Sequence, residues 1–311
     1  MTDTAETGHP TATTTPGFFA ALGATLLWSV GNVAIAGSPI NGLALAFHRL
    51  WIAAIIFTAV LYATGGRLTA ASFRHGWKGA VFFTADIATF YLAVKYTTLA
   101  DATTISALQP ALILFIAGSM FGERVRPRHI VCTVIAIVGV LAVVRGSSTS
   151  GDVTAFGEVM AVLALFAWVG YFVYSKQARQ HLGTVEYLTV IMIVGVPLML
   201  PLSLLTGQLT DQGWLSLSDY GWVFLVIALP GTGHLLINWA HNHTTITLTS
   251  LLTLLMPAIS TACAAVFLDQ EVTALTVIGI SVVLVSLAFV IAGDARAAAI
   301  EAESAEDGPP I

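Results

Sequence analysis

Ionisable side chains are rare within the long apolar segments of this sequence, and four of them have the chemistry to bind or carry charge. His48 and Arg49 are adjacent in one segment, Asp86 lies in the next, and His234 lies in the second half of the chain. A charge in a hydrocarbon layer is costly, so it normally faces a cavity or an opposite charge. Arg49 and Asp86 are near enough in depth to pair, and the pair is either structural or contacts substrate or protons. His48 and His234 are further candidates for proton coupling.

A polar stripe surrounds His234. Asn238 and His241 follow it by four and seven residues, so all three share one helix face. Three interpretations stay open: a cavity wall that contacts substrate, a helix end at the membrane surface that includes His243, and a metal site. Metal is the least supported, because no carboxylate or cysteine completes a ligand set. We therefore expect His234 and Asn238 to contact substrate and expect no metal.

Three polar residues spaced three apart recur at matching positions in the second half of the chain. The first set is Thr103, Ser106 and Gln109, and 147 residues later stand Ser250, Thr253 and Met256. Hydrogen bonding between helices is the ordinary explanation for such residues. A central site lined by both halves is the alternative, with Ser106, Gln109 and Thr253 as candidate contacts.

Aromatic residues lie deep within the apolar segments. Trp28 has Asn32 one turn on, Trp168 has Tyr171 beside it, and Tyr91 is similarly deep. Interfacial tryptophans belong at helix ends, so these positions need another explanation. They are either ordinary packing or the walls of a cavity for a flat or amphipathic substrate.

Proline and glycine mark candidate hinges. Pro110 recurs as Pro257 at the same offset of 147, and each proline frees a backbone carbonyl one turn back. Pro230, Gly231 and Gly233 interrupt a third segment, where a hinge and a packed kink are both open interpretations.

The elements that must position these residues are membrane-spanning helices. Hydrophobic residues make up 57% of the chain and charged residues only 9%, which indicates an integral membrane protein. A spanning helix needs about 20 mostly apolar residues. Ten segments meet this requirement: 18–36, 42–64, 77–96, 102–121, 129–145, 156–176, 185–206, 220–240, 245–268 and 273–292.

The ten helices fall into two repeats. Besides the prolines, Gly17 and Trp28 match Gly157 and Trp168 at an offset of 140. Five helices are an odd number, so the second repeat must enter the membrane from the opposite side. We predict repeats at 17–146 and 155–293, with disordered tails at 1–16 and 294–311. Helices one to four and six to nine would surround a central cavity, and helices five and ten would lie outside.

Basic residues orient this stack, because they concentrate on cytoplasmic loops. With the N-terminus inside, two basic residues, Lys95 and Arg145, fall outside. Nine fall in cytoplasmic segments: Arg67, Arg74, Lys78, Arg124, Arg126, Arg128, Lys176, Arg179 and Arg296. We predict a multi-pass protein of the inner (cytoplasmic) membrane with both termini in the cytoplasm.

Together these features resemble the ten-helix EamA-type branch of the drug/metabolite transporter superfamily. The resemblance rests on the five-plus-five plan, the matched prolines and tryptophans, and the run Phe121 to Arg124 followed by Gly139. The second half departs from it, with Leu268 to Glu271 and Ser286 at the matching positions. The resemblance implies export of amino acids or related metabolites, and such sequences include exporters of aromatic amino acids.

We therefore expect a secondary transporter that moves a small metabolite by alternating access, as a monomer in the lipid bilayer, with no cofactor, catalytic residue or nucleic-acid partner. Coupling to protons and facilitated exchange are both open. The rival hypotheses are a membrane-embedded enzyme, which needs a clustered catalytic set, and a receptor or assembly protein, which usually has large loops or tails for a partner.

Overall fold

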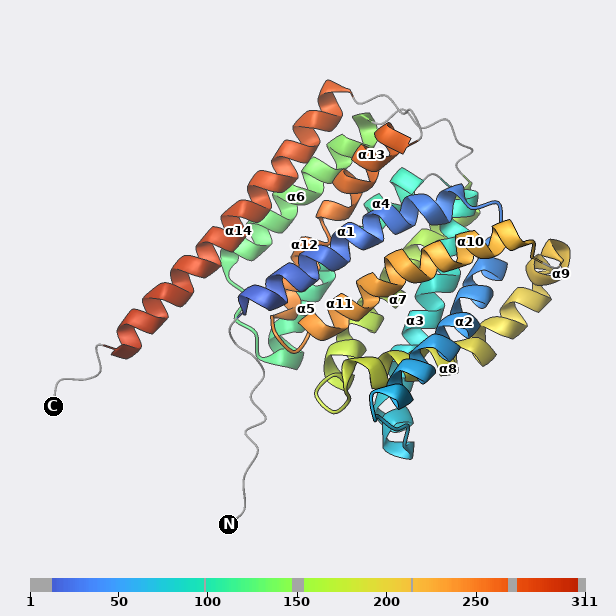
Figure 1. Ribbon diagram of the computed structural model, residues 1–311. Coiled ribbons are helices and arrows are strands. Elements are labelled where there is room, and N and C mark those ends of the chain that lie inside the picture. The colour runs from blue at the N-terminus through green and yellow to red at the C-terminus, as the bar shows by residue number, and fades with distance from the viewer. Residues whose placement is uncertain (1–12, 98, 147–153, 214, 268–272, 307–311) are drawn as a thin grey trace, which may run out of the picture.

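The computed structural model describes residues 13–97, 99–146, 154–213, 215–267 and 273–306 as a bundle of helices (Figure 1). Its first half contains α1 (Thr15–Gly37), α2 (Gly42–Ala63), α3 (Ala70–Tyr96), α4 (Leu99–Ser106), α5 (Gln109–Phe121) and α6 (Pro127–Gly146). Its second half contains α7 (Ala155–Ala178), α8 (Thr184–Leu205), α9 (Gln208–Gln212), α10 (Leu217–Val226), the π-helical turn η1 (Ile227–Gly231), α11 (Thr232–Ala240), α12 (Ile246–Leu252), α13 (Leu255–Phe267) and α14 (Ala274–Glu306).

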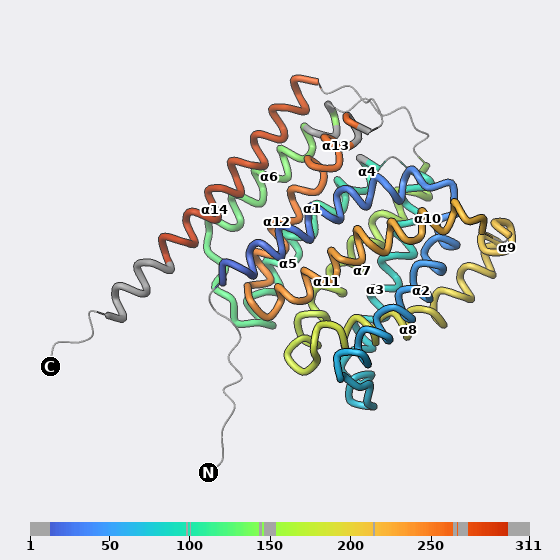
Figure 2. The backbone as a smooth tube through the Cα atoms, viewed as in Figure 1, coloured from blue at the N-terminus to red at the C-terminus, as the bar shows by residue number. Residues whose placement is uncertain are grey.

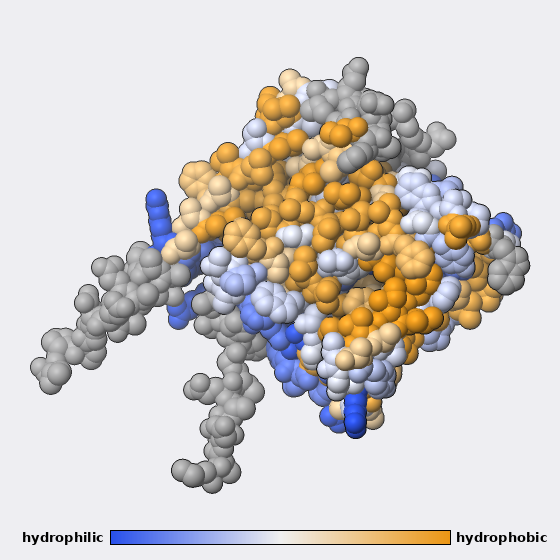
Figure 3. Space-filling view, viewed as in Figure 1, coloured by the Kyte–Doolittle hydropathy of each residue, from blue (hydrophilic) through white to orange (hydrophobic). Residues whose placement is uncertain are grey.

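These elements form the ten predicted spans. Seven spans are single helices, whereas α4 with α5, α10 with η1 and α11, and α12 with α13 each form one interrupted span. Eight stretches of the described chain are long and apolar enough to cross a membrane, and α6 contains a shorter apolar helix. α3 is the tenth span. The outer surface is broadly apolar along the middle of the bundle, as Figure 3 shows for one face, and side chains such as Phe115 and Phe289 point outward.

The two halves are inverted relative to each other. α2 and α8 are related by the repeat, and they run antiparallel: the Ser203 hydroxyl donates to the carbonyl of Leu43, and the Thr189 hydroxyl donates to the carbonyl of Phe57. α6 and α14 are likewise related and antiparallel (Figure 2), because Gly139 faces Gly279 while Gly293 faces Arg128. This confirms the predicted inverted repeat, with α6 and α14 at one edge of the bundle.

Matching contacts tie the first helix of each repeat to the other repeat. Thr14 caps the N-terminus of α1, and its hydroxyl donates to the carbonyl of His243 at 3.0 Å. Thr154 caps α7 in the same way, and its hydroxyl donates to the carbonyl of Tyr96 at 2.5 Å. One turn on, Gly17 and Gly157 lie against those same carbonyls, where an added Cβ would come within 2.5 Å of the oxygen. The repeat is therefore visible in individual hydrogen bonds.

Short connections join the helices at two faces of the bundle. We call the face with Thr14, the 122–126 loop, the 241–245 loop and Asp294 the N face, and the opposite one the far face. Thr13 and Thr14 contact the 243–244 loop on the N face. On the far face, Gln208 and Gln212 of α9, a helix that was not predicted, accept hydrogen bonds from backbone amides at the start of α2.

The C-terminal tail differs from the prediction within the described residues. A disordered tail was expected from 294 onward, but α14 continues as a helix through Glu306. The reason is composition: the stretch after Arg296 is rich in alanine and glutamate, which are strong helix formers. Residues 307–311, and residues 1–12 of the predicted N-terminal tail, lie outside the described part of the chain.

Candidate functional site

A cavity of about 60 Å³ lies in the middle of the bundle. Its walls come from α1, α2, α3, α4, α7, η1, α11 and α13, together with the breaks after α4 and α12. α6 and α14 contribute no residue to its lining as described, which agrees with their predicted outer position; α8 contributes none either, although it was expected to do so. Eight predicted contacts line the cavity: Trp28, Asn32, Asp86, Tyr91, Ser106, Trp168, His234 and Thr253.

The cavity is too small for a metabolite in this conformation. A volume of this size has room for a few water molecules. Its lining includes Ile35 near the end of α1, Tyr91 near the end of α3 and Thr103 near the start of α4, all close to the far face. The cavity thus lies between the middle of the bundle and the far face, and the N-face half is packed.

Aromatic rings form one wall of the cavity. Trp28 and Trp168, from the first helix of each repeat, meet edge to face with ring centroids 4.8 Å apart. The His234 ring lies 5.1 Å from that of Trp28. Gly233 allows this approach, because an added Cβ would lie 2.8 Å from the Trp28 ring. Gly233 therefore serves close packing here, and whether it also acts as a hinge stays a prediction.

Arg49 and Asp86 face the same cavity without forming the predicted direct pair. The Arg49 Nη1 donates to the Tyr91 hydroxyl at 2.6 Å, and its guanidinium lies 6.0 Å from the centre of the Phe83 ring. Both charged residues are buried, with 2% and 7% of their surfaces exposed. Within the described residues, no ion pair or hydrogen bond reaches the Asp86 carboxylate. The difference arises because the Tyr91 hydroxyl, rather than the Asp86 carboxylate, takes the hydrogen bond from the guanidinium.

Three donors of the cavity lining have no acceptor among the described residues. They are Arg49 Nη2, Asn32 Nδ2 and Trp28 Nε1. A buried donor without an acceptor is costly, so such groups in a cavity wall are suited to hydrogen-bond a ligand. The cavity therefore combines one unpaired carboxylate with three unpaired donors.

Three predicted contacts lie behind the lining, toward the N face. Asn238 Nδ2 donates to the Tyr171 hydroxyl at 2.7 Å, and that hydroxyl lies 3.1 Å from His234 Nδ1. Gln109 accepts a hydrogen bond from Thr253 at 3.1 Å. We call Gln109, Tyr171 and Asn238 the cavity floor. In this conformation they support the lining rather than belong to it.

His48, the remaining candidate, is away from the cavity. Its Nδ1 accepts a hydrogen bond from the Trp51 indole at 3.1 Å, one turn along α2, and its ring packs against Tyr220. Of the four ionisable candidates, Arg49, Asp86 and His234 therefore share the cavity and His48 does not.

The predicted hinge prolines mark helix breaks at the level of the cavity. Pro110 lies in the first turn of α5 and Pro257 in the first turn of α13. The breaks at 107–108 and 253–254 match within one residue at the offset of 147. The carbonyl of Thr253 is not free as expected, because it accepts from the Met256 amide at 2.9 Å. Pro230 lies in η1 beside Gly231 and packs against Gly31. Motion at these positions stays a prediction.

Some lining residues were not predicted. Ile87 and Phe90 flank Asp86 and Tyr91 on one face of α3, so the helical period is the signal that would have found them. On the N face, Lys176 and Arg179 were predicted only as cytoplasmic basic residues, and the structure buries both, with 2% and 6% of their surfaces exposed. Nothing in the sequence around Lys176 and Arg179 indicates that these two side chains are buried.

Comparison with known proteins identifies this architecture. The sequence profile of the EamA-like transporter family matches residues 15–145 and 155–292, which are the two repeats. The chain belongs to the EamA-like transporter family. An uncharacterized transporter of Clostridium kluyveri is 22% identical to this EamA-like protein over 213 residues, covering 67% of this chain and 68% of the relative. A protein of known crystal structure superposes with a TM-score of 0.73 at 20% identity, covering 90% of this chain and 98% of the other. That likeness shows the shared fold. The 268–271 segment, where the second half departs from the pattern of the first, lies outside the described residues.

Proposed function

We propose that this protein is a secondary transporter for a zwitterionic amino acid with a large apolar or aromatic side chain, and that the central cavity is its binding site. Family membership supports transport over the enzyme and receptor alternatives. The observation that carries the substrate class is the pairing, in one cavity, of an unpaired carboxylate with unpaired donors beside two tryptophans.

Each part of an amino acid has a chemical counterpart in the lining. The Asp86 carboxylate matches an ammonium group. Arg49 Nη2 and Asn32 Nδ2 match a carboxylate, because charge-assisted hydrogen bonds to carboxylates are among the stronger polar contacts. Trp28 and Trp168 supply apolar surface for a side chain and can stack on a ring. A substrate that lacks either charge would leave a buried charge uncompensated.

The inverted repeats support alternating access as the mechanism. Two similar packings of opposite orientation have similar energies, so exchanging them converts a state open to one face into a state open to the other. The small cavity and the packed N-face half describe a conformation closed toward the N face. The breaks beside Pro110 and Pro257 are the points at which we expect the helices to bend.

The orientation in the membrane is proposed from the charges of the two faces, and the direction of transport from the family resemblance. The N face carries most of the lysines and arginines, which supports a cytoplasmic N face with both termini inside, in the inner membrane. The resemblance to metabolite exporters supports export. We propose that the monomer is the functional unit, since the cavity is built within one chain.

Counterflow in proteoliposomes tests this function. Vesicles preloaded with unlabelled phenylalanine, tryptophan, leucine or a nucleobase are diluted into the labelled compound, and transient accumulation of label identifies a carrier and its substrate. We expect accumulation for large apolar amino acids, and none for the nucleobase or for phenylalanine amide, which lacks the carboxylate. Equal flux of the amide and the amino acid would contradict the proposed role of Arg49. Repeating the assay with an imposed pH gradient separates proton coupling through Asp86 or His234 from exchange.

A further inference from the structure

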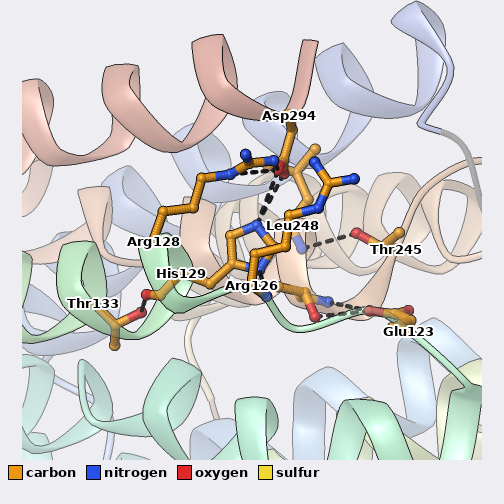
Figure 4. A network of polar contacts seen from close by, with 9 residues as sticks. Glu123, Arg126, Arg128, His129, Thr133, Thr245, Leu248 and Asp294 are labelled. Carbon is orange, nitrogen blue, oxygen red and sulfur yellow. Dashed lines mark hydrogen bonds and ion pairs between the residues drawn. The ribbon is translucent and has the colours of Figure 1, made fainter. Parts of the chain in front are cut away.

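On the N face, the carboxylate of Glu123 links the two repeats. Glu123, in the loop after α5, accepts hydrogen bonds from the amides of Ile246 and Thr247 at 2.7 and 3.0 Å and from the Thr247 hydroxyl at 2.8 Å. Within the described part of the chain it also forms an ion pair with Lys176 of α7, at 3.3 Å. We call this set the N-face seal. Figure 4 shows Glu123 beside the chain near Thr245, close to a second link in which Asp294 holds Arg128 and His129.

A cluster of basic side chains is buried behind the N-face seal. It consists of Lys176, Arg179 and His241, with 2%, 6% and 1% of their surfaces exposed. Lys176 donates to the carbonyl of Thr244 at 2.9 Å, and Arg179 Nε donates to the carbonyl of Asn238 at 2.8 Å. We call these three residues the N-face basic cluster.

Several polar atoms of this cluster have no partner among the described residues. They are Arg179 Nη1 and both ring nitrogens of His241, with Asn238 Oδ1 beside them. Two carboxylates act on the charges of this cluster: Glu123 on Lys176, and Glu186 on Arg179. Glu123 is used by the N-face seal, and Glu186 accepts a hydrogen bond from Ser72 at 2.5 Å. Burial and the charges of Lys176 and Arg179 hold the pKa of His241 well below its usual range, and burial lowers the pKa of Arg179 to about 10.

Burying unpartnered donors next to like charges opposes stability, so this arrangement needs another reason. Its position supplies one. Trp168, Phe172, Lys176 and Arg179 follow one face of α7 from the cavity to the N face, with steps of four, four and three residues. On α11, His234 and Asn238 follow one face from the cavity toward the N face, and His241 continues this line at the C-cap. The cluster therefore stands at the N-face end of the two stripes that lead to the cavity.

We propose that Lys176, Arg179 and His241 form a second binding site, a loading site for the carboxylate of the substrate, which is covered in this conformation and becomes accessible at the N face when Glu123 leaves Thr247 and Lys176. This inference rests on the proposed function. In the closed state, the carboxylate of Glu123 forms an ion pair with Lys176 and so takes the place that we assign to the substrate carboxylate. The substrate carboxylate takes over that charge when the N face opens, and Arg179 Nη1 gains its acceptor.

Sidedness of transport tests the loading site. In oriented proteoliposomes, Arg179→Gln should raise the KM for phenylalanine offered at the N face about tenfold, the size expected for one charge-assisted hydrogen bond. The KM for phenylalanine offered at the far face should stay within about twofold, because the cavity is unchanged. Arg179→Lys keeps the charge and should recover most of the loss. Arg67→Gln, an exposed arginine on the same face, is the matched control.

The outcomes separate this inference from the proposed function. If the wild-type protein carries no amino acid, the proposed function fails. If it transports phenylalanine but Arg179→Gln raises the KM equally at both faces, or at neither, the loading site is wrong.

A second measurement does not depend on transport. Phenylglyoxal added at the N face modifies exposed arginines, and mass spectrometry reports its reaction with Arg179. Glu123→Gln should speed this reaction about tenfold by weakening the N-face seal, and excess acetate, a bare carboxylate, should slow it again. Glu158→Gln, an exposed glutamate on the far face, is the control. An unchanged rate in Glu123→Gln, or no protection by acetate, overturns the proposal.

Discussion

The two repeats build the same helices but contribute unequally to the cavity. Of its sixteen lining residues, eleven come from the first repeat and five from the second. Trp28 has Trp168 as its counterpart, and Ser106 has Thr253. Arg49 and Asp86 have no charged counterpart, since the second repeat is apolar or glycine-rich at the matching heights of α8 and α11. Under the proposed function, we expect the shared features to serve the rocking motion and the unshared ones to select the substrate.

The largest expected effect on transport comes from removing the charge of Asp86, which has no charged counterpart in the second repeat. Asp86→Asn keeps the shape of the side chain and removes the partner of the substrate ammonium. Loss of one member of a buried charge pair costs about 2–5 kcal/mol, so kcat/KM for phenylalanine should fall at least about thirtyfold. Counterflow measures this. Asp211→Asn, at an exposed position of α9, is the matched control, and an equal loss in both variants would remove Asp86 from the site.

The paired tryptophans should give a smaller and more symmetric effect. Trp168→Ala removes one side of the aromatic wall, and aromatic pairs contribute about 0.5–1.5 kcal/mol beyond the area that they bury. We expect the KM for tryptophan to rise about tenfold, and Trp28→Ala to act similarly. Trp77→Ala, at an exposed tryptophan, should leave transport unchanged. If only one of the two variants raised the KM, the repeats would differ in their aromatic surface as well as in charge.

The sequence predicts features that repeat along the chain or that are unusual within an apolar segment. The matched prolines and tryptophans locate the inverted repeat, and buried polar or aromatic residues such as Asp86 and His234 are recognised by the cost of placing them in a membrane. The partner of Arg49 could not be predicted, because the rotation of α2 against α3 decides between Asp86 and Tyr91. The burial of Lys176 and Arg179 was missed for a similar reason: residues at helix ends are solvated unless another repeat covers them.

The matched glycines test the scaffold that the two repeats share. Gly17→Ala and Gly157→Ala each force a Cβ against a backbone carbonyl, which cannot move like a flexible side chain. Overpacking of this kind costs about 1–3 kcal/mol. The midpoint of thermal unfolding in detergent should fall by similar amounts in both variants. Gly221→Ala is the control, because no atom lies within 4 Å of the added Cβ; a loss at only one of the two matched glycines would argue against equivalent packing.

The smallest effect is expected at the two threonine caps. Thr14→Ala and Thr154→Ala each remove a hydroxyl that caps its own helix and bonds to the other repeat. Loss of an N-cap costs about 1 kcal/mol. The two variants should be destabilised to the same extent in the same thermal assay, and the double variant should show the sum, because the sites are on opposite faces. Clear non-additivity would mean that the two faces communicate in the resting protein.

The most direct test of the central claim is the distance across the N face. Spin labels at Arg124 and Asn242, in a background without Cys132 and Cys263, report whether the two repeats separate there. We predict two distance populations, with phenylalanine changing their proportions and Glu123→Gln favouring the longer distance. One distance that neither phenylalanine nor Glu123→Gln changes would contradict alternating access through this cavity.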